Sequence, residues 1–335
     1  MENLRYASAI LLGLLFNFIS FQHPILGQSA NHLKILSLNT WGLPIMLPGS
    51  DQSKRFDAIV DSINAGDADI VCLQECFSKR LRKRLSRGLN NKYRYYSDIM
   101  KSRREMLILN MDLHGGLITL SKHPVICEEF HGFAVREDMN PEEKIGRKGF
   151  LFTQIKTPDG IINVINTHLY AGNHQHAELM RFEQLKYMNS ILASMEDFYL
   201  YPTFLVGDLN INHPETLPLN DKLIKSFCFD YLTNEIGFFD TGCEVGHFSF
   251  TYDHARNSYA CKNDGSQKLD YILIHPVANN TFEVANCCIR FDGGVKLSDH
   301  FGIEAQINIR TLSQSNYQVL VNENAKLSKD QGISP

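Results

Sequence analysis

The sequence predicts an α/β sandwich in which two sheets pack face to face and helices lie outside them. Short apolar stretches that are typical of buried strands alternate with stretches of helical periodicity and with tight turns. Helices separate some strands and turns alone separate others, a mixture that disfavours a purely parallel, doubly wound sheet. The 335 residues are 44% apolar and 21% charged, which is enough apolar material for one large core.

The first half of the chain contains one expected helix and several expected strands. The helix covers residues 54–64, whose apolar side chains recur at helical spacing. Residues 150–156 and 161–166 read as a hairpin, because the sequence Pro-Asp-Gly between them is a strong turn signal. The other strands are expected at residues 33–38, 70–73 and 116–121.

The second half contains the longest expected helix, at residues 174–198, where leucine, methionine and phenylalanine recur at core-packing positions. From residue 311 to 335 the chain is polar, and we expect a loose tail. No linker divides the chain, so residues 31–310 are expected to form a single catalytic domain. Strands are expected at residues 203–206, 269–274 and 302–307.

The N-terminus resembles an export signal. Arg5 precedes an apolar stretch at residues 7–21, within which Asn17 and Ser20 interrupt the run of large apolar residues, and this length is short for a membrane span. We expect residues 1–27 to be a signal peptide and the mature protein to be extracellular. An uncleaved anchor is the alternative interpretation.

Charge and cysteine content narrow the classes of protein to which this chain could belong. The net charge of −4 disfavours a protein that holds nucleic acid by bulk electrostatics, although the basic run at residues 79–84 is either a local patch or a solvated helix face. The eight cysteines match neither a disulfide framework nor a zinc site. Cys243 with Cys261 is the best single guess for a disulfide, because both lie in loop-like sequence.

Polar residues recur where the expected strands begin or end. A single one of them would be assigned to a turn, but the ordered series is much harder to explain in that way. Strand ends hold side chains rigidly, while the loops beyond leave room for a substrate. The series consists of Asn39, Glu75, His168, Asp208, Asn210, Asp270, Asp299 and His300.

This series resembles the endonuclease/exonuclease/phosphatase superfamily, which has the deoxyribonuclease I-like fold. The resemblance implies a four-layer αββα sandwich with the active site at one end of the paired sheets. The matching segments are SLNTWG at 37–42, LQE at 73–75, NTHL at 166–169, GDLN at 207–210, LDYIL at 269–273 and LSDH at 297–300.

Within the superfamily the chain is most similar to the sphingomyelinase branch. The Lys148-Gly149-Phe150 stretch is similar to one that sphingomyelinases carry near the site, which implies that Lys148 binds substrate. The supporting segments are LNTWGLP at 38–44, GLITLSKHPV at 116–125, RKGFLFTQI at 147–155 and THLYA at 167–171.

Phosphodiester hydrolysis needs a cation, an activated water and help for the leaving oxygen. Glu75 is the expected Mg²⁺ ligand, because hard cations prefer carboxylate oxygens, and Mn²⁺ or Co²⁺ could replace Mg²⁺. The resemblance supports this assignment, together with a place for Asn39 in or beside the metal shell. Asp299 either contacts metal or supports His300.

Proton transfer is assigned to His300, because the pKa of an imidazole suits that task near neutral pH. The resemblance implies that Asp270 holds the other ring nitrogen of His300. His168 would bind or protonate a phosphate oxygen, and Asn210 would donate to a non-bridging oxygen. Whether Asp208 or His300 is the general base stays open at this stage.

The best-fitting reaction is hydrolysis of sphingomyelin in membrane surfaces to ceramide and phosphocholine, and we expect a monomer. Exposed aromatic residues near the site are then expected, with residues 248–252 and Tyr259 as candidates for membrane contact or for ordinary packing. A secreted Mg²⁺-dependent nuclease of the same fold is the alternative, although nucleic acid is not the favoured partner. An inositol-phosphate phosphatase and a binding module with a dead site are weaker alternatives.

Overall fold

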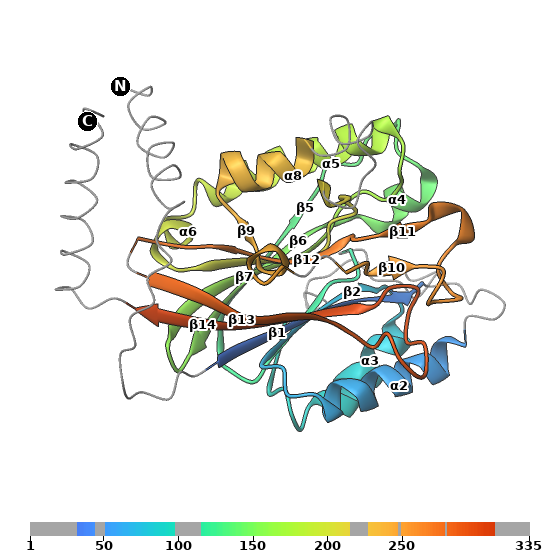
Figure 1. The fold of residues 1–335 in the computed structure, drawn as a ribbon, viewed down its shortest axis with the longest axis horizontal. Helices are drawn as coiled ribbons and strands as arrows, with labels where there is room; N and C mark the ends of the chain where they lie inside the picture. Colours follow the sequence, from blue (N-terminus) through green and yellow to red (C-terminus); the bar gives the residue numbers. More distant parts are fainter. Residues whose placement is uncertain are drawn as a thin grey trace.

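Two six-stranded mixed sheets form the centre of the molecule, and helices cover the outer face of each (Figure 1). This computed structural model describes residues 32–43, 51–97, 115–214, 227–246, 249–278 and 280–311. The arrangement confirms the predicted four-layer αββα sandwich. The expected leader, residues 1–27, and all but the first residue of the expected tail lie outside the described residues.

The first sheet combines the N-terminal strands with the last two strands of the chain. β1 pairs with β2 in parallel and with β14 in antiparallel orientation, which places the N-terminal strand at the centre of the sheet. In spatial order the strands are β13 (Asn280–Arg290), β14 (Gly302–Thr311), β1 (His32–Gly42), β2 (Ile70–Cys76), β4 (Ile118–Ser121) and β3 (Tyr95–Ser97).

The second sheet is built from the middle of the chain. The predicted hairpin is present as β6 and β7, and β7 then pairs in parallel with β8. A separate two-stranded ribbon consists of β10 (Tyr252–Asp253) and β11 (Ser266–Gln267). In spatial order the second sheet is β5 (Val125–Gly132), β6 (Gly149–Thr157), β7 (Gly160–His168), β8 (Thr203–Asp208), β12 (Asp270–His275) and β9 (Phe239–Asp240).

The helices form the two outer layers. In Figure 1, α2 and α3 lie below the first sheet, and α5 and α8 lie above the second. None of the described helices is long and apolar enough to cross a membrane. The helices are α2 (Gln52–Ala65), α3 (Lys79–Leu89), α4 (Pro141–Gly146), α5 (Gln175–Leu192), α6 (Glu196–Leu200), α8 (Phe227–Asp230), the π-helix η3 (Tyr231–Ile236), α9 (Thr241–Glu244) and the 3₁₀-helix η4 (Lys262–Asp264).

Two sequence-based expectations about this fold are wrong. The helix expected at residues 174–198 ends at Leu192, and α6 begins after Met195, which has extended backbone angles. The hydroxyl of Ser194 donates to the carbonyl of Ile191 at 2.6 Å. Such a local hydrogen bond competes with helix continuation, which periodicity alone does not reveal.

The expected Cys243–Cys261 disulfide is the second error, because both thiols are free. Cys243 belongs to the short helix α9, which packs against β12 and β13, and its Sγ atom lies 3.2 Å from His213 Nε2. Cys261 precedes η4, and its backbone N–H donates to the hydroxyl of Tyr252. Loop-like sequence around both Cys243 and Cys261 was therefore no indication that the two thiols lie close together.

The core between the sheets is largely apolar, but a buried polar link around Asn166 crosses it. Asn166 of β7 accepts a hydrogen bond from the Gln74 amide of β2 at 2.8 Å. The Asn166 amide donates to the carbonyls of Leu73 and Ile118 at 3.2 and 2.9 Å, across to the first sheet. Buried polar groups of this kind are stable only when paired, so the link favours one alignment of the sheets.

We predict that Asn166→Ala lowers the free energy of unfolding by about 2 kcal/mol, because the buried Gln74 amide loses its shortest hydrogen bond and the Leu73 and Ile118 carbonyls lose a donor. Urea denaturation measures this change. The control is Asn64→Ala, which removes an exposed hydrogen bond to the Gly88 carbonyl and should cost less than about 0.5 kcal/mol. Equal stability of the two variants would show that the inter-sheet link contributes nothing.

Candidate active site

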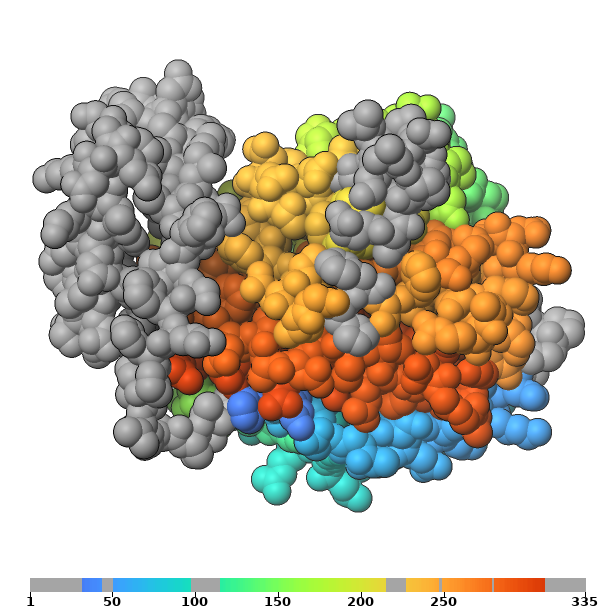
Figure 2. Space-filling model, in the orientation of Figure 1, coloured from blue at the N-terminus to red at the C-terminus, as the bar shows by residue number. Residues whose placement is uncertain are grey.

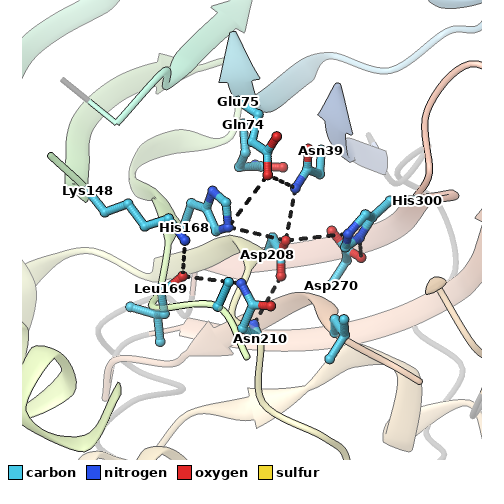
Figure 3. A network of polar contacts seen from close by, with 12 residues as sticks. Asn39, Gln74, Glu75, Lys148, His168, Leu169, Asp208, Asn210, Asp270 and His300 are labelled. Carbon is cyan, nitrogen blue, oxygen red and sulfur yellow. Dashed lines mark hydrogen bonds and ion pairs between the residues drawn. The ribbon is translucent and has the colours of Figure 1, made fainter. Parts of the chain in front are cut away.

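Polar side chains from both sheets meet at one end of the sandwich (Figure 3). Parallel pairing places Asn39 beside Gln74 in the first sheet and His168 beside Asp208 in the second. β12 runs antiparallel to β8, so its first residue, Asp270, lies opposite Asp208. A residue that begins a strand therefore joins residues that end strands, and the predicted series forms one cluster.

Asp208 lies at the centre of this cluster and connects the two sheets. Its Oδ2 atom accepts a hydrogen bond of 2.9 Å from the Asn39 amide. The same oxygen lies 3.4 Å from His168 Nε2 and 3.7 Å from His300 Nε2. Its Oδ1 atom accepts from the backbone N–H of Asn210 at 3.0 Å. Burial is the main cause that raises the pKa of Asp208, to about 6.

His300 and Asp270 form the ion pair that the superfamily resemblance implied. The distance between His300 Nδ1 and Asp270 Oδ2 is 2.8 Å, and Asp270 is completely buried. The Tyr252 ring packs edge-on against the imidazole, with 5.1 Å between ring centroids. Although burial opposes its charge, the carboxylates of Asp270 and Asp208 raise the pKa of His300 well above its usual range. In the metal-free protein these carboxylates therefore favour the imidazolium form of His300.

His168 has the opposite protonation state. Burial first, and then the positive charges of Lys148 and His300, lower its pKa well below the usual range. Its Nδ1 atom is buried and has no hydrogen-bond partner among the described residues. A neutral imidazole in this position can donate a hydrogen bond from its N–H to a phosphate oxygen.

The Glu75 carboxylate has the properties of a cation ligand. Its Oε1 atom accepts from the Asn39 amide at 3.0 Å, whereas its buried Oε2 atom has no partner among the described residues. Burial and the charge of Asp299 raise the pKa of Glu75 to about 7. A bound divalent cation would stabilise the ionised carboxylate against both its burial and the repulsion from Asp299. Carboxylate oxygens are ligands that suit Mg²⁺. Glu75 and Asn39 therefore fit the predicted metal site.

Asp299 faces the same region but makes a local contact. Its Oδ1 atom accepts from the Ser298 hydroxyl at 3.0 Å, and burial raises its pKa. The structure places it close enough to Glu75 for its charge to act on that carboxylate. The guanidinium of Arg55 partly compensates the charge of Asp299.

Lys148 reaches the opposite side of the cluster. Its ammonium group donates to the Leu169 carbonyl and to the carboxylate of Glu143, both at 2.8 Å. The Asn210 amide donates to the same Leu169 carbonyl at 3.2 Å. Glu143 was not identified from the sequence, and the signal that could have revealed it is an acidic turn immediately before the Lys-Gly-Phe stretch.

Three residues of this region have left-handed backbone conformations that non-glycine residues rarely adopt. The φ angles are 55° at Glu75, 51° at Asn210 and 48° at Trp41. Such strain costs on the order of 1–3 kcal/mol and clusters at functional sites. The fold therefore holds the expected metal ligand Glu75 and the Asn210 amide in orientations that an ordinary strand end would not provide.

A second group of ligand-type side chains consists of His213, Asp240 and Cys243. Asp240 forms a buried ion pair with Lys268, so its negative charge is already compensated by a side chain. Lys268 also lies over the Tyr271 ring, 4.8 Å from its centroid. We therefore interpret this group as a structural ion pair between Asp240 and Lys268, with His213 and Cys243 beside it.

Residues 36–300 match the sequence model of the endonuclease/exonuclease/phosphatase family, and this stretch contains every residue of the active-site cluster. The chain belongs to this family. The match confirms the resemblance inferred from the motifs, and it establishes the family's fold for this chain.

Two curated relatives in the family carry sphingomyelinase names. The chain is 25% identical over 296 residues to the "Putative neutral sphingomyelinase" of Drosophila melanogaster, a match that covers 83% of this chain and 61% of that protein. It is 26% identical over 282 residues to sphingomyelinase C of Bacillus cereus, covering 78% of this chain and 80% of that one. The chain thus spans less than two thirds of the Drosophila protein.

A solved structure with the same fold contains magnesium. The beta toxin of Staphylococcus aureus, as a double mutant with bound magnesium ions, superposes with a TM-score of 0.62 at 22% identity. The match covers 82% of this chain and 99% of the toxin chain. At this identity the likeness concerns the fold.

We predict that Mg²⁺ raises the melting temperature more strongly at about pH 8 than at about pH 6. The raised pKa of Glu75 means that the folded, metal-free protein binds a proton more tightly than the unfolded chain does, so this proton stabilises the fold at low pH and is lost as pH rises through about 7. Mg²⁺ competes with the proton, and below about pH 7 its affinity should fall by up to tenfold per pH unit.

Differential scanning fluorimetry with and without Mg²⁺ measures this effect. Glu75→Gln should abolish the Mg²⁺-dependent shift at both pH values, while Glu235→Gln, at an exposed position, should retain it. A shift that persists in Glu75→Gln would place the metal elsewhere.

Proposed function

We propose that the protein is a metal-dependent phosphodiesterase that hydrolyses sphingomyelin to ceramide and phosphocholine. One observation supports metal-dependent phosphodiester hydrolysis above the others. A buried oxygen of Glu75, without a hydrogen-bond partner among the described residues, lies in the same cluster as the His300–Asp270 pair. Because two relatives have sphingomyelinase names, sphingomyelin is the substrate that we favour. Membership in the family supports hydrolysis of a phosphate ester.

Glu75 would hold the cation, with Asn39 orienting its carboxylate through the hydrogen bond to Oε1. Mg²⁺ is the expected ion, and Mn²⁺ or Co²⁺ could replace it. When bound, the ion would compensate the charge of the phosphodiester and disfavour the imidazolium form of His300. Three groups of the chain then remain to bind the phosphate oxygens: His168, Asn210 and Lys148.

Proton transfer in this proposal belongs to His300. In its neutral form the Nε2 atom accepts a proton from the attacking water, while Asp270 holds the Nδ1–H and stabilises the imidazolium that results. Asp208 lies between His168 and His300 and orients both rings through its Oδ2 atom. The neutral His168 remains as a hydrogen-bond donor toward the phosphate, and the leaving oxygen takes its proton from solvent.

A half-buried aromatic pair beside this cluster suits the choline group of sphingomyelin. Trp41 follows Asn39 by two residues, its backbone N–H donates to the Asn39 side chain at 3.0 Å, and its ring lies 5.4 Å from that of Tyr259. The guanidinium of Arg55 already packs over one face of each ring, at 4.8 and 5.8 Å from the centroids, so a choline group would use the opposite face of a ring. Aromatic faces attract quaternary ammonium groups, which a nuclease substrate lacks.

The aromatic residues expected for membrane contact differ in exposure. Phe250 and Tyr259 are half-buried, whereas Tyr252 is buried against His300 and therefore serves packing. Phe248 lies outside the described residues. Extracellular location, action as a monomer on membrane sphingomyelin and the absence of a nucleic-acid substrate are part of the same proposal. A secreted nuclease remains the competing function that the assays below must separate.

We predict that Glu75→Ala and His300→Ala each lower turnover by at least about 10³-fold without unfolding, because each removes a group that acts on the reacting atoms. Phosphocholine release is measured with sphingomyelin and phosphatidylcholine, with and without a chelator, and circular dichroism checks the fold. Nicking of plasmid DNA is measured in parallel. Near-normal activity of either folded variant would contradict its role, and DNA cleavage without phosphocholine release would identify a nuclease.

A second prediction concerns the headgroup. Trp41→Ala should raise the KM for p-nitrophenylphosphorylcholine about tenfold, because it removes a ring face from the quaternary ammonium group. Turnover of bis(p-nitrophenyl) phosphate, which has no such group, should be nearly unchanged, and Trp41→Phe should recover part of the loss. An equal effect on both substrates would mean that Trp41 only supports the fold of the site.

A further inference from the structure

The segment that follows Glu75 has an unusual charge composition. Between residues 77 and 97 the chain contains eight Lys or Arg residues and no Asp or Glu, although the whole chain has a net charge of −4. Most of these cations belong to α3, which begins four residues after Glu75. A strongly basic surface therefore begins near the active-site end of the molecule.

Helix α3 separates its apolar and basic side chains. Leu81, Leu85 and Leu89 are buried against the first sheet and α2, and the buried guanidinium of Arg82 donates to the carbonyls of Cys76 and Leu117. The remaining cations line a surface hollow of about 550 Å³, to which no other described residue contributes. They are Lys79, Arg80, Lys83, Arg84 and Arg87.

The charge of this basic face is largely uncompensated. Arg84 is paired with Asp57 at 2.7 Å. Arg80, Lys83 and Arg87 are exposed and have no hydrogen-bond or ion-pair partner within the described part of the chain. Five cations around one hollow repel one another, so an anion placed there is favoured electrostatically.

We propose that the basic face of α3, made of Lys79, Arg80, Lys83, Arg84 and Arg87, docks the protein on anionic phospholipid headgroups of a membrane. This inference goes beyond the proposed hydrolysis and rests on it only in that the substrate lies in a bilayer. Sphingomyelin has a zwitterionic headgroup and attracts no net charge, so anionic neighbouring lipids supply the long-range attraction.

The geometry favours a membrane over a nucleic acid as the partner. The blue segment that contains α2 and α3 forms the lower edge of the face shown in Figure 2, on the outer helix layer. A bilayer needs to contact only this flank and the adjoining end of the sheets. A long nucleic acid would also extend over the acidic remainder of the chain, which opposes it.

The test compares two triple variants with the same change in net charge. The docking variant combines Arg80→Gln, Lys83→Gln and Arg87→Gln, and the control combines Lys156→Gln, Lys186→Gln and Lys262→Gln at exposed positions on other elements. Co-sedimentation uses the full chain with phosphatidylcholine vesicles that contain or lack phosphatidylserine, without sphingomyelin, so that binding is measured apart from turnover.

Each basic residue near an anionic surface strengthens binding about fivefold, so the docking variant should bind phosphatidylserine vesicles on the order of 100-fold more weakly than the unaltered protein. The control variant should bind nearly as well as the unaltered protein, and added salt should weaken binding of both. Hydrolysis of p-nitrophenylphosphorylcholine should be the same in all three proteins.

Equal loss of vesicle binding in both triple variants, or no loss in either, would overturn the proposal. Binding of single-stranded DNA that depends on α3, without binding to phosphatidylserine vesicles, would overturn it in favour of a nucleic-acid surface. If vesicle docking follows the expectation but no phosphocholine is released, the proposed hydrolysis fails while the docking surface stands.

Discussion

The hydrogen bond from the Asn39 amide to the Asp208 carboxylate is the contact on which the rest of the site depends. It joins the two sheets at the end where their functional side chains emerge, and the same Asn39 amide also binds Glu75. Asp208 in turn contacts both His168 and His300. One side-chain amide therefore couples the metal-binding half of the site to the half that handles protons, and the Asn166 link deeper in the core supports the same sheet alignment.

Burial of several carboxylates explains the electrostatics of the site. Glu75, Asp208 and Asp299 all have raised pKa values with burial as the main cause, whereas His300 acquires its charge from Asp270 and Asp208. Such an arrangement is costly in the metal-free protein, because buried charges need compensation. A divalent cation at Glu75 would provide this compensation, so the stability of the fold would depend on both pH and metal binding.

Three different parts of the molecule are the basis for the proposed reaction, the proposed substrate headgroup and the proposed membrane surface. In the proposed function, the cluster around Asp208 would carry out the phosphodiester chemistry. Trp41 and Tyr259 would bind the headgroup beside this cluster. The basic face of α3, on the outer helix layer, would bind the membrane surface that holds the substrate. Separate experiments can therefore contradict the proposed reaction, the proposed headgroup contact or the proposed membrane surface without contradicting the other two.

The sequence by itself indicated the buried strands that carry the site and the residue types at their ends, because buried strands have short apolar signatures and polar residues stand out beside them. It did not indicate β5 or β13, which are largely half-exposed or exposed. It could not show that Asp270, at the start of a strand, lies opposite Asp208, since antiparallel pairing is decided by sheet order. It likewise missed the break before Met195, the separation of Cys243 from Cys261 and the pairing of Glu143 with Lys148. Local sequence carries propensity and spacing, whereas these contacts arise only when distant segments pack together, so tertiary structure alone decided them.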